Sequence, residues 1–182
     1  MTSKKHRTPW PVPVLLMMLA SLASVATSYR PPPTHAPVYM SWKAFRESAR
    51  VVPPRAIQER GKIYSWGRYL FLSEPNQGVH VFDNTHPQAP VAKAFIEAPG
   101  TIDIAGRGRY LYIDSFVDLL VFELTPQPFT LRLVRRLKDV FPYNYRQNLP
   151  RQETAGRYIW PQYPDKTKGV VVRWKPMPGR KP

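Results

Sequence analysis

The sequence predicts an all-β protein made of two to three four-stranded, propeller-like sheets, which together would form an incomplete β-propeller. The main observation is an internal repeat: the segment 67–72 (Gly-Arg-Tyr-Leu-Phe-Leu) recurs 41 residues later as 108–113 (Gly-Arg-Tyr-Leu-Tyr-Ile). Val81-Phe82-Asp83 recurs 40 residues later as Val121-Phe122-Glu123. A period near 40 residues with strand-like composition is typical of propeller blades. The 22 prolines among 182 residues also disfavour long helices.

Each repeat is expected to contain four strands. The strand segments are rich in Val, Ile, Tyr, Phe and Leu, and Gly, Pro and Asn separate them. Gly67, Gly108 and the Asn76-Gln77-Gly78 segment predict tight hairpin turns, because glycine accepts a positive φ. The predicted strands cover 62–66, 69–73, 78–83 and 91–97 in the first repeat, and 101–105, 109–114, 118–124 and 131–137 in the second.

Other segments complete the predicted organisation. A weaker third copy starts at 156–160 (Gly-Arg-Tyr-Ile-Trp), and 169–174 is similar to 78–83. One short helix is expected near 40–50, with Ser41 as its N-cap and Pro53-Pro54 as its stop. The chain then divides into a signal peptide or membrane anchor (1–27), a Pro-rich linker with the short helix (28–60), a two-blade β-repeat core (61–137) and a basic tail with a partial third repeat (138–182).

The N-terminal segment indicates export. Lys4, Lys5 and Arg7 precede a largely apolar run over 12–26, which ends in the small residues of Ser24-Val25-Ala26. A basic start, an apolar stretch of this length and a small-residue exit describe a secretory signal. The run is short for a membrane-spanning helix, although an uncleaved anchor and a buried N-terminal helix are alternatives. The predicted location is the periplasm, the cell surface or the membrane.

The net charge of +15 belongs to the flanks of the repeat. Residues 61–125 carry a net charge of −2, whereas 126–182 carry +10 and several aromatic residues. Basic residues interleaved with aromatic ones suit an anionic polymer, although a solvated basic flank is the simpler interpretation. For an exported chain, anionic lipid or polysaccharide of the envelope is the expected partner, and nucleic acid is disfavoured. The absence of Cys excludes disulfides and a thiol nucleophile.

Several segments within 38–175 resemble the bacterial LVIVD-repeat proteins, a β-propeller-like family of exported or lipid-anchored chains, over the N-terminal portion of that family. The resemblance implies an exported repeat protein and no particular activity. This chain is shorter than the family pattern and lacks the lipobox Cys that many members carry. The segments that carry the resemblance are Gly61–Tyr64, Tyr69–Pro75, Gly78–Asn84, Pro99–Ala105 and Leu111–Leu119.

The candidate site residues are acidic. Asp103, Asp114 and Asp118 could form a calcium or other cation site with hard oxygen ligands, whereas the simpler interpretation is that they cap turns. His80 lies between two valines, so it is predicted to face away from them and reach solvent. Ser73-Glu74 and Asp114-Ser115 are interpreted as recurring turn residues, and no sequence motif supports a catalytic group.

The favoured hypothesis is therefore an exported, non-catalytic β-repeat protein that acts as a binding or scaffold module of the bacterial cell envelope and needs no cofactor. One alternative is a cation-dependent hydrolase that uses the acidic cluster. Another is a truncated propeller fragment that associates with a partner chain. Unpaired sheet edges, expected near 62–64 and 170–172, favour self-association or a partner chain that completes the sheet stack.

Overall fold

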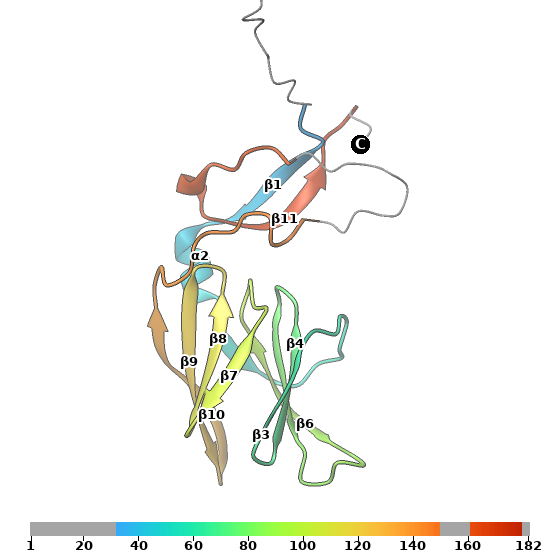
Figure 1. The fold of residues 1–182 in the computed structure, drawn as a ribbon, viewed down its shortest axis with the longest axis vertical. Coiled ribbons are helices and arrows are strands. Elements are labelled where there is room, and N and C mark those ends of the chain that lie inside the picture. The colour runs from blue at the N-terminus through green and yellow to red at the C-terminus, as the bar shows by residue number, and fades with distance from the viewer. Residues whose placement is uncertain (1–31, 150–160, 180–182) are drawn as a thin grey trace, which may run out of the picture. The chain divides into compact units, whose positions relative to one another are not determined.

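A computed structural model describes residues 32–149 and 161–179 of this chain. The predicted signal segment and the start of the third repeat at 156–160 lie outside these residues. The described part is all-β, with eleven strands in three antiparallel sheets, none of which closes into a barrel (Figure 1). Within the same part, no helix is both long enough and apolar enough to cross a membrane.

The two larger sheets are successive antiparallel meanders that follow the sequence repeat. The first sheet contains, in spatial order, β2 (Arg50–Val52), β6 (Val91–Glu97), β5 (Gly78–Asp83), β4 (Tyr69–Glu74) and β3 (Ile63–Trp66). The second sheet contains β10 (Phe129–Leu137), β9 (Asp118–Pro126), β8 (Tyr110–Ser115) and β7 (Ile104–Arg107). All eight strands predicted for the two repeats are present.

The hairpin turns are also confirmed, because Gly67 and Gly108 have positive φ angles of 58° and 61°. Most strand boundaries differ from the prediction by no more than two residues, and one start differs by three. The strand predicted over 101–105 begins at Ile104 instead. The backbone of the residues just before Ile104 bonds to a side chain instead of a neighbouring strand. The side chain of Asp114 accepts the N–H groups of Ile102 and Asp103 at 2.8 and 2.7 Å. These donors are therefore not available for a strand ladder.

The main hydrophobic core lies between the first and second sheets, and the two sheets contribute opposite faces of the repeat to it. Phe71 and Val81 of the first sheet are buried in this core, whereas their repeat counterparts Tyr112 and Val121 lie outside it. Conversely, Leu111 of the second sheet belongs to the core while its counterpart in the first sheet does not. The sheets thus stack front to back: the face that the first sheet turns toward the core corresponds to the face that the second sheet turns away from it.

Segments outside the repeat add further strands. β1 (His35–Met40) pairs with β11 (Val170–Pro176) in a two-stranded ribbon, and β2 joins the edge of the first sheet beside β6. The segment predicted as a linker therefore contributes two strands. The segment predicted as a partial third repeat contributes β11, which pairs with β1 and with no other strand of the described residues. These pairings join residues far apart in the sequence, so no local pattern indicates them.

The edge expected to be exposed near Val170-Val171-Val172 is covered. Val170 and Val171 are 0% and 1% exposed. The N–H of Val171 donates to the Tyr143 hydroxyl at 2.9 Å, and its carbonyl accepts from the Asn148 side-chain amide at 3.0 Å. Side chains from 143–148 thus occupy the backbone groups that a further strand would use. At the other expected edge, Ile63 is 70% exposed.

A short helix, α2 (Trp42–Glu47), connects the ribbon to the sheets. Ser41 is its N-cap, as predicted, and accepts the N–H of Ala44 at 3.2 Å. Phe45 is fully buried and packs edge-on against Phe116 with ring centroids 5.7 Å apart. These rings form a second hydrophobic cluster with Val117 and Val170, so one helix residue contacts both the β8–β9 turn and β11.

Replacing Phe45 with alanine should therefore destabilise the protein by about 3–5 kcal/mol, because it leaves a cavity where three segments meet. Urea unfolding followed by tryptophan fluorescence measures this change. Phe141→Ala is the matched control and should cost less than about 1 kcal/mol, since Phe141 is already 37% exposed. Equal losses for the two variants would contradict the role assigned to Phe45.

Candidate functional site

The polar side chains that the repeat buries gather where the β4–β5 and β8–β9 turns meet the connection 98–103. The N–H of Asn76 donates to the carbonyl of Thr101 at 2.7 Å, and Gly100 donates to the carbonyl of Asn76 at 3.1 Å. Gly100 has φ +83°, and a Cβ there would lie 2.4 Å from the ring of Phe116. Because these three loops are in such close contact, side chains anchored on them have little freedom to move.

Glu74, at the end of β4, is fully buried and bonded to a buried histidine. Its Oε2 lies 2.7 Å from His80 Nε2, and the two side chains are 0% and 2% exposed. His80 does face away from Val79 and Val81, as the alternation requires, but the prediction that it reaches solvent was wrong. That side of the sheet is covered locally, and the ring of Phe95 lies 4.6 Å from the imidazole centroid.

Arg55 completes this cluster from the segment that follows β2. Its Nη2 lies 3.2 Å from Glu74 Oε2 and donates to Gln77 Oε1 at 2.9 Å. Its guanidinium carbon lies 4.0 Å from the centroid of the Phe95 ring. Three different contacts therefore fix the guanidinium plane, and the buried carboxylate supplies the charged one. We call Arg55, Glu74, His80 and Phe95 the Glu74 cluster.

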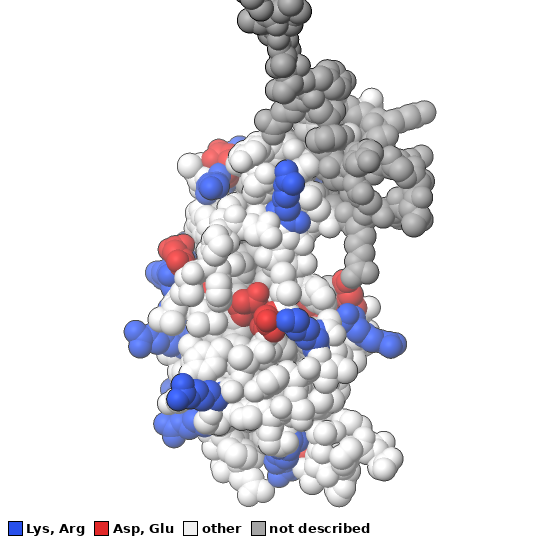
Figure 2. All heavy atoms as spheres, in the orientation of Figure 1, with Lys and Arg blue, Asp and Glu red and all other residues white. Residues whose placement is uncertain are grey.

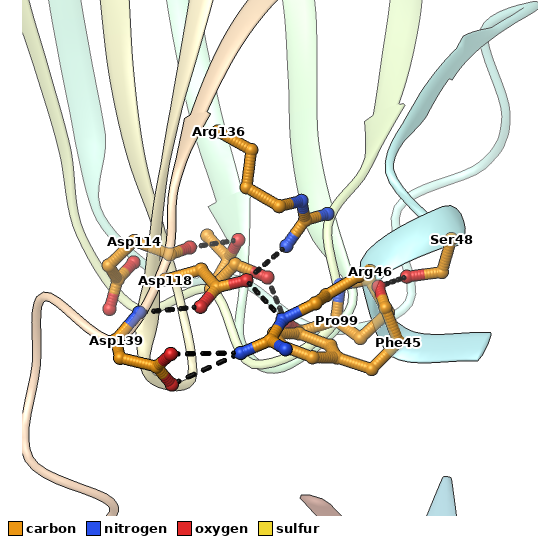
Figure 3. A network of polar contacts seen from close by, with 10 residues as sticks. Phe45, Arg46, Ser48, Pro99, Asp114, Asp118, Arg136 and Asp139 are labelled. Atoms are coloured by element: carbon orange, nitrogen blue, oxygen red, sulfur yellow. Dashed lines mark hydrogen bonds and ion pairs between the residues drawn. The ribbon is translucent and has the colours of Figure 1, made fainter. Parts of the chain in front are cut away.

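A second buried carboxylate, Asp118 at the start of β9, lies between two arginines (Figure 3). Arg136 Nη1 donates to Asp118 Oδ2 at 2.9 Å, and Arg46 Nε lies 3.6 Å from the same oxygen. The other oxygen accepts the backbone N–H of Asp139 at 3.0 Å. Arg46 also donates to both carboxylate oxygens of Asp139 at 3.1 Å. Two arginines and two aspartates thus tie helix α2 to the second sheet.

The structure brings together two of the three aspartates proposed for a cation site. Asp103 and Asp114 are neighbours, but Asp114 Oδ1 accepts two backbone N–H groups and Asp103 pairs with Lys62 at 2.9 Å. Asp118 lies on the opposite face of the second sheet, because it pairs with Ser115 while Asp114 pairs with Leu119. In the described residues, no group of three or more His, Asp or Glu side chains could hold a metal ion. The calcium site stays a prediction.

Two hollows flank this end of the sheets. One, of about 510 Å³, lies over the Glu74 cluster and is lined by Arg50, Arg55, Gln77, Phe95, Glu97 and Met40 among others. The other, of about 530 Å³, lies on the outer face of the second sheet and is lined mainly by Ile102, Tyr112, Leu119, Phe141 and Asp114. The exposed lining of both hollows is mostly apolar, and the first has the larger share of residues with hydrogen-bonding side chains. Both volumes are within the range of small-molecule sites.

The surface charge is dispersed on the face that Figure 2 shows. Basic side chains are spread along that face, and several lie beside acidic ones. Within the repeat, Arg68 pairs with Asp83 and Arg109 pairs with Glu123. Neighbouring opposite charges weaken the field that a polyanion would experience, so this face presents no single dense basic patch.

The arrangement positions donors and does not expose a reactive carboxylate. Glu74 and Asp118 are both fully buried, so neither touches a molecule bound at the surface. The hollow over the Glu74 cluster instead presents the guanidinium of Arg55 and the side-chain amide of Gln77. Such groups bind and orient a ligand by hydrogen bonding.

Comparison of this chain with protein-family models, with curated proteins and with solved structures found no match. The resemblance to the LVIVD-repeat proteins stays a prediction.

Sequence reasoning singled out Glu74, His80 and Asp118 but missed the arginines that pair with the two carboxylates. Arg55 lies in a segment without strand or helix periodicity, and Arg46 and Arg136 are two among many arginines. The sequence did offer one signal for the Glu74–His80 pair. In the predicted hairpin Glu74 opposes Gly78, so Glu74 and His80 lie diagonally across the two strands on the same face of the sheet. A paired acid and imidazole could have been inferred from that register.

Asp118→Ala should destabilise the protein by about 3–5 kcal/mol, because it leaves two arginines without the buried carboxylate that compensates their charge. Chemical denaturation of the purified protein measures the loss. Glu123→Ala is the comparison: Glu123 pairs with Arg109 and Arg132, which are 68% and 75% exposed, and its removal should cost less than about 1 kcal/mol. A loss of stability in Asp118→Ala as small as that in Glu123→Ala would refute the role assigned to Asp118, which is to tie helix α2 to the second sheet.

Asp114 and Asp103 should contribute to the pH dependence of folding stability with opposite signs. Burial raises the pKa of Asp114 above its ordinary value, so ionisation opposes folding and its contribution to stability falls as pH rises from the unfolded pKa through the folded one. The hydrogen bond from Lys62 lowers the pKa of Asp103, so its contribution is present above the unfolded pKa and is lost as pH falls through the folded one.

Asp114→Asn should consequently equal or exceed the wild type in stability at neutral pH and lose that advantage in acid. Its amide oxygen can still accept the two backbone N–H groups. Asp103→Asn should be less stable than the wild type at neutral pH, and the deficit should shrink in acid. Thermal melts of the three proteins between pH 3 and pH 7.5 measure both trends. The same trend in both variants would contradict the opposite pKa shifts assigned to Asp114 and Asp103.

Proposed function

We propose that this chain is an exported, non-catalytic β-repeat protein with propeller-like sheets, and that it serves as a binding or scaffold module of the bacterial cell envelope. The observation that carries the proposal is the front-to-back stacking of the two repeat sheets on one core. A sheet pair that uses opposite faces of the same repeat can be extended by further sheets on either side. Front-to-front packing would close the pair instead.

The chain path supports the propeller-like part of the proposal. β6, near one edge of the first sheet, is followed by β7, which forms the opposite edge of the second sheet. β7 lies against β3, where the Tyr64 hydroxyl accepts the N–H of Gly106 at 2.9 Å. Each blade of a propeller is connected to the next in this way, from an outer strand to the neighbouring inner strand.

The open ends of the stack support a scaffold role. The outer face of the second sheet carries the apolar hollow lined by Tyr112 and Leu119, a surface that another sheet could cover. A second copy or a separately encoded partner chain would supply that sheet. The closely packed loops at the end of the sheets would meanwhile present the hollow over the Glu74 cluster to an envelope component, and anionic lipid or polysaccharide are the proposed partners.

Cell fractionation tests the proposal. The full chain, expressed in a bacterial host, should be processed after Ala26 and should sediment with the envelope fraction, from which high salt releases it if the partner is anionic. A variant with Leu15→Arg and Leu16→Arg interrupts the apolar run and should remain unprocessed in the cytoplasm. N-terminal sequencing of each fraction identifies the processed form.

Two outcomes would contradict the proposal. A wild-type chain that keeps Met1 and stays in the cytoplasm would exclude export. A processed chain that remains entirely free of the envelope at low salt would exclude the binding role. Mass spectrometry of the same fractions separates the two results.

A further inference from the structure

The hollow over the Glu74 cluster offers hydrogen-bond donors. Arg55 Nη2 serves Glu74 and Gln77, and the amide oxygen of Gln77 is occupied by Arg55. The other N–H groups of Arg55 and the amide NH₂ of Gln77 have no acceptor among the described residues. Glu97, the acidic side chain in the lining, is held by Arg50 at 2.5 Å. Arg55 and Gln77 thus have unused donors at this lining, which match an oxyanion. The buried Oε1 of Glu74 behind them has no hydrogen-bond partner among the described residues.

The internal repeat shows that strand pairing does not require the buried dyad behind this lining. Glu74 corresponds to Ser115 and His80 corresponds to Leu120, and both counterparts are buried. The pairings are equivalent, because Leu72 opposes His80 in the first sheet as Ile113 opposes Leu120 in the second. The second sheet thus has the same register without a charged pair. A buried carboxylate is costly, and its visible effect in the first sheet is to hold Arg55.

We propose that the hollow is a binding site for an oxyanion, a carboxylate or a phosphate group, carried by a sugar-sized ligand. Arg55 binds the oxyanion with the free side of its guanidinium fork, and Gln77 donates a further hydrogen bond. At the rim, Arg50 is 68% exposed and pairs with Glu97, so these two charges offset each other. Glu74 and His80 are positioning residues that keep the guanidinium of Arg55 over the ring of Phe95. The inference deepens the proposed envelope-binding function and rests on it for the identity of the sugar.

Calorimetric titration of the purified full chain at low salt tests the site. The probes are D-glucuronate, which carries a carboxylate, D-glucose 6-phosphate, which carries a phosphate, and neutral D-glucose. At least one charged sugar should bind tenfold or more tightly than glucose, and the better of the two identifies the source of the oxyanion. Binding of neither charged sugar, or equal binding of all three probes, would overturn the proposal.

Two charge-matched variants separate a specific site from general attraction. Arg55→Gln should weaken binding of the preferred probe at least tenfold. Arg107→Gln removes the same charge from an exposed arginine of the second sheet that does not line this hollow, and it should leave the affinity unchanged. Equal losses in the two variants would show non-specific electrostatics and refute the site.

The positioning role is tested by giving the first sheet the residues of the second. The double variant with Glu74→Ser and His80→Leu should unfold cooperatively, yet lose at least tenfold in affinity. Glu74→Gln, which keeps an oxygen near Arg55 without the charge, should lose less. Unchanged affinity in the double variant, or its failure to fold, would overturn the positioning role, while Arg55→Gln independently decides the site.

The outcomes also separate this inference from the proposed function. A chain that sediments with envelopes but binds neither charged sugar retains its envelope role and lacks the oxyanion site. A chain that binds a charged sugar in vitro but does not associate with envelopes has the site, and its envelope role is excluded.

Discussion

The fully buried carboxylate of Asp118 joins parts of the chain that the repeat by itself would leave separate. Its two oxygens engage Arg46 of helix α2, Arg136 of β10 and the backbone N–H of Asp139. Helix α2 directly follows β1, so the same contact also fixes the C-terminal end of β1 in the two-stranded ribbon. Because a buried charge is tolerated only with its partners in place, the helix, the second sheet and the turn after β10 must be ordered together.

The two sheets show how one strand pattern can support different chemistry. In the second sheet, Leu120 adds to the hydrophobic core between the sheets. In the first sheet, the equivalent position is His80, and the face it occupies is covered by Arg55 and Phe95. Front-to-back stacking explains the difference, since the equivalent faces of the two sheets meet different neighbours. The first sheet can carry a polar cluster because no repeat sheet packs against that face within the described residues.

The two-stranded ribbon gives the Val-rich segment of the C-terminal third a strand partner outside the two repeats. This segment is similar to a repeat strand, and in the structure it pairs with a segment near the N-terminal end of the described residues. The side chains of Tyr143 and Asn148 complete the hydrogen bonding of Val171. The two ends of the described chain are thereby brought together by backbone pairing, beside the end of the sheets where the polar clusters lie.

The sequence by itself determined the all-β class, the eight strands of the two repeats, the glycine turns and the capped helix at Ser41. These features depend on neighbours within a few residues, through side-chain alternation, positive φ and N-capping. Only the tertiary structure decided that the strand near 101–105 starts at Ile104, that His80 is buried, and that β1 pairs with β11. Each of these depends on a partner supplied by another part of the chain: the carboxylate of Asp114, the side chains of Glu74 and Phe95, and the backbone of residues 170–176. Local patterns carry no information about such partners, because the free energy of these contacts arises only after the chain has folded.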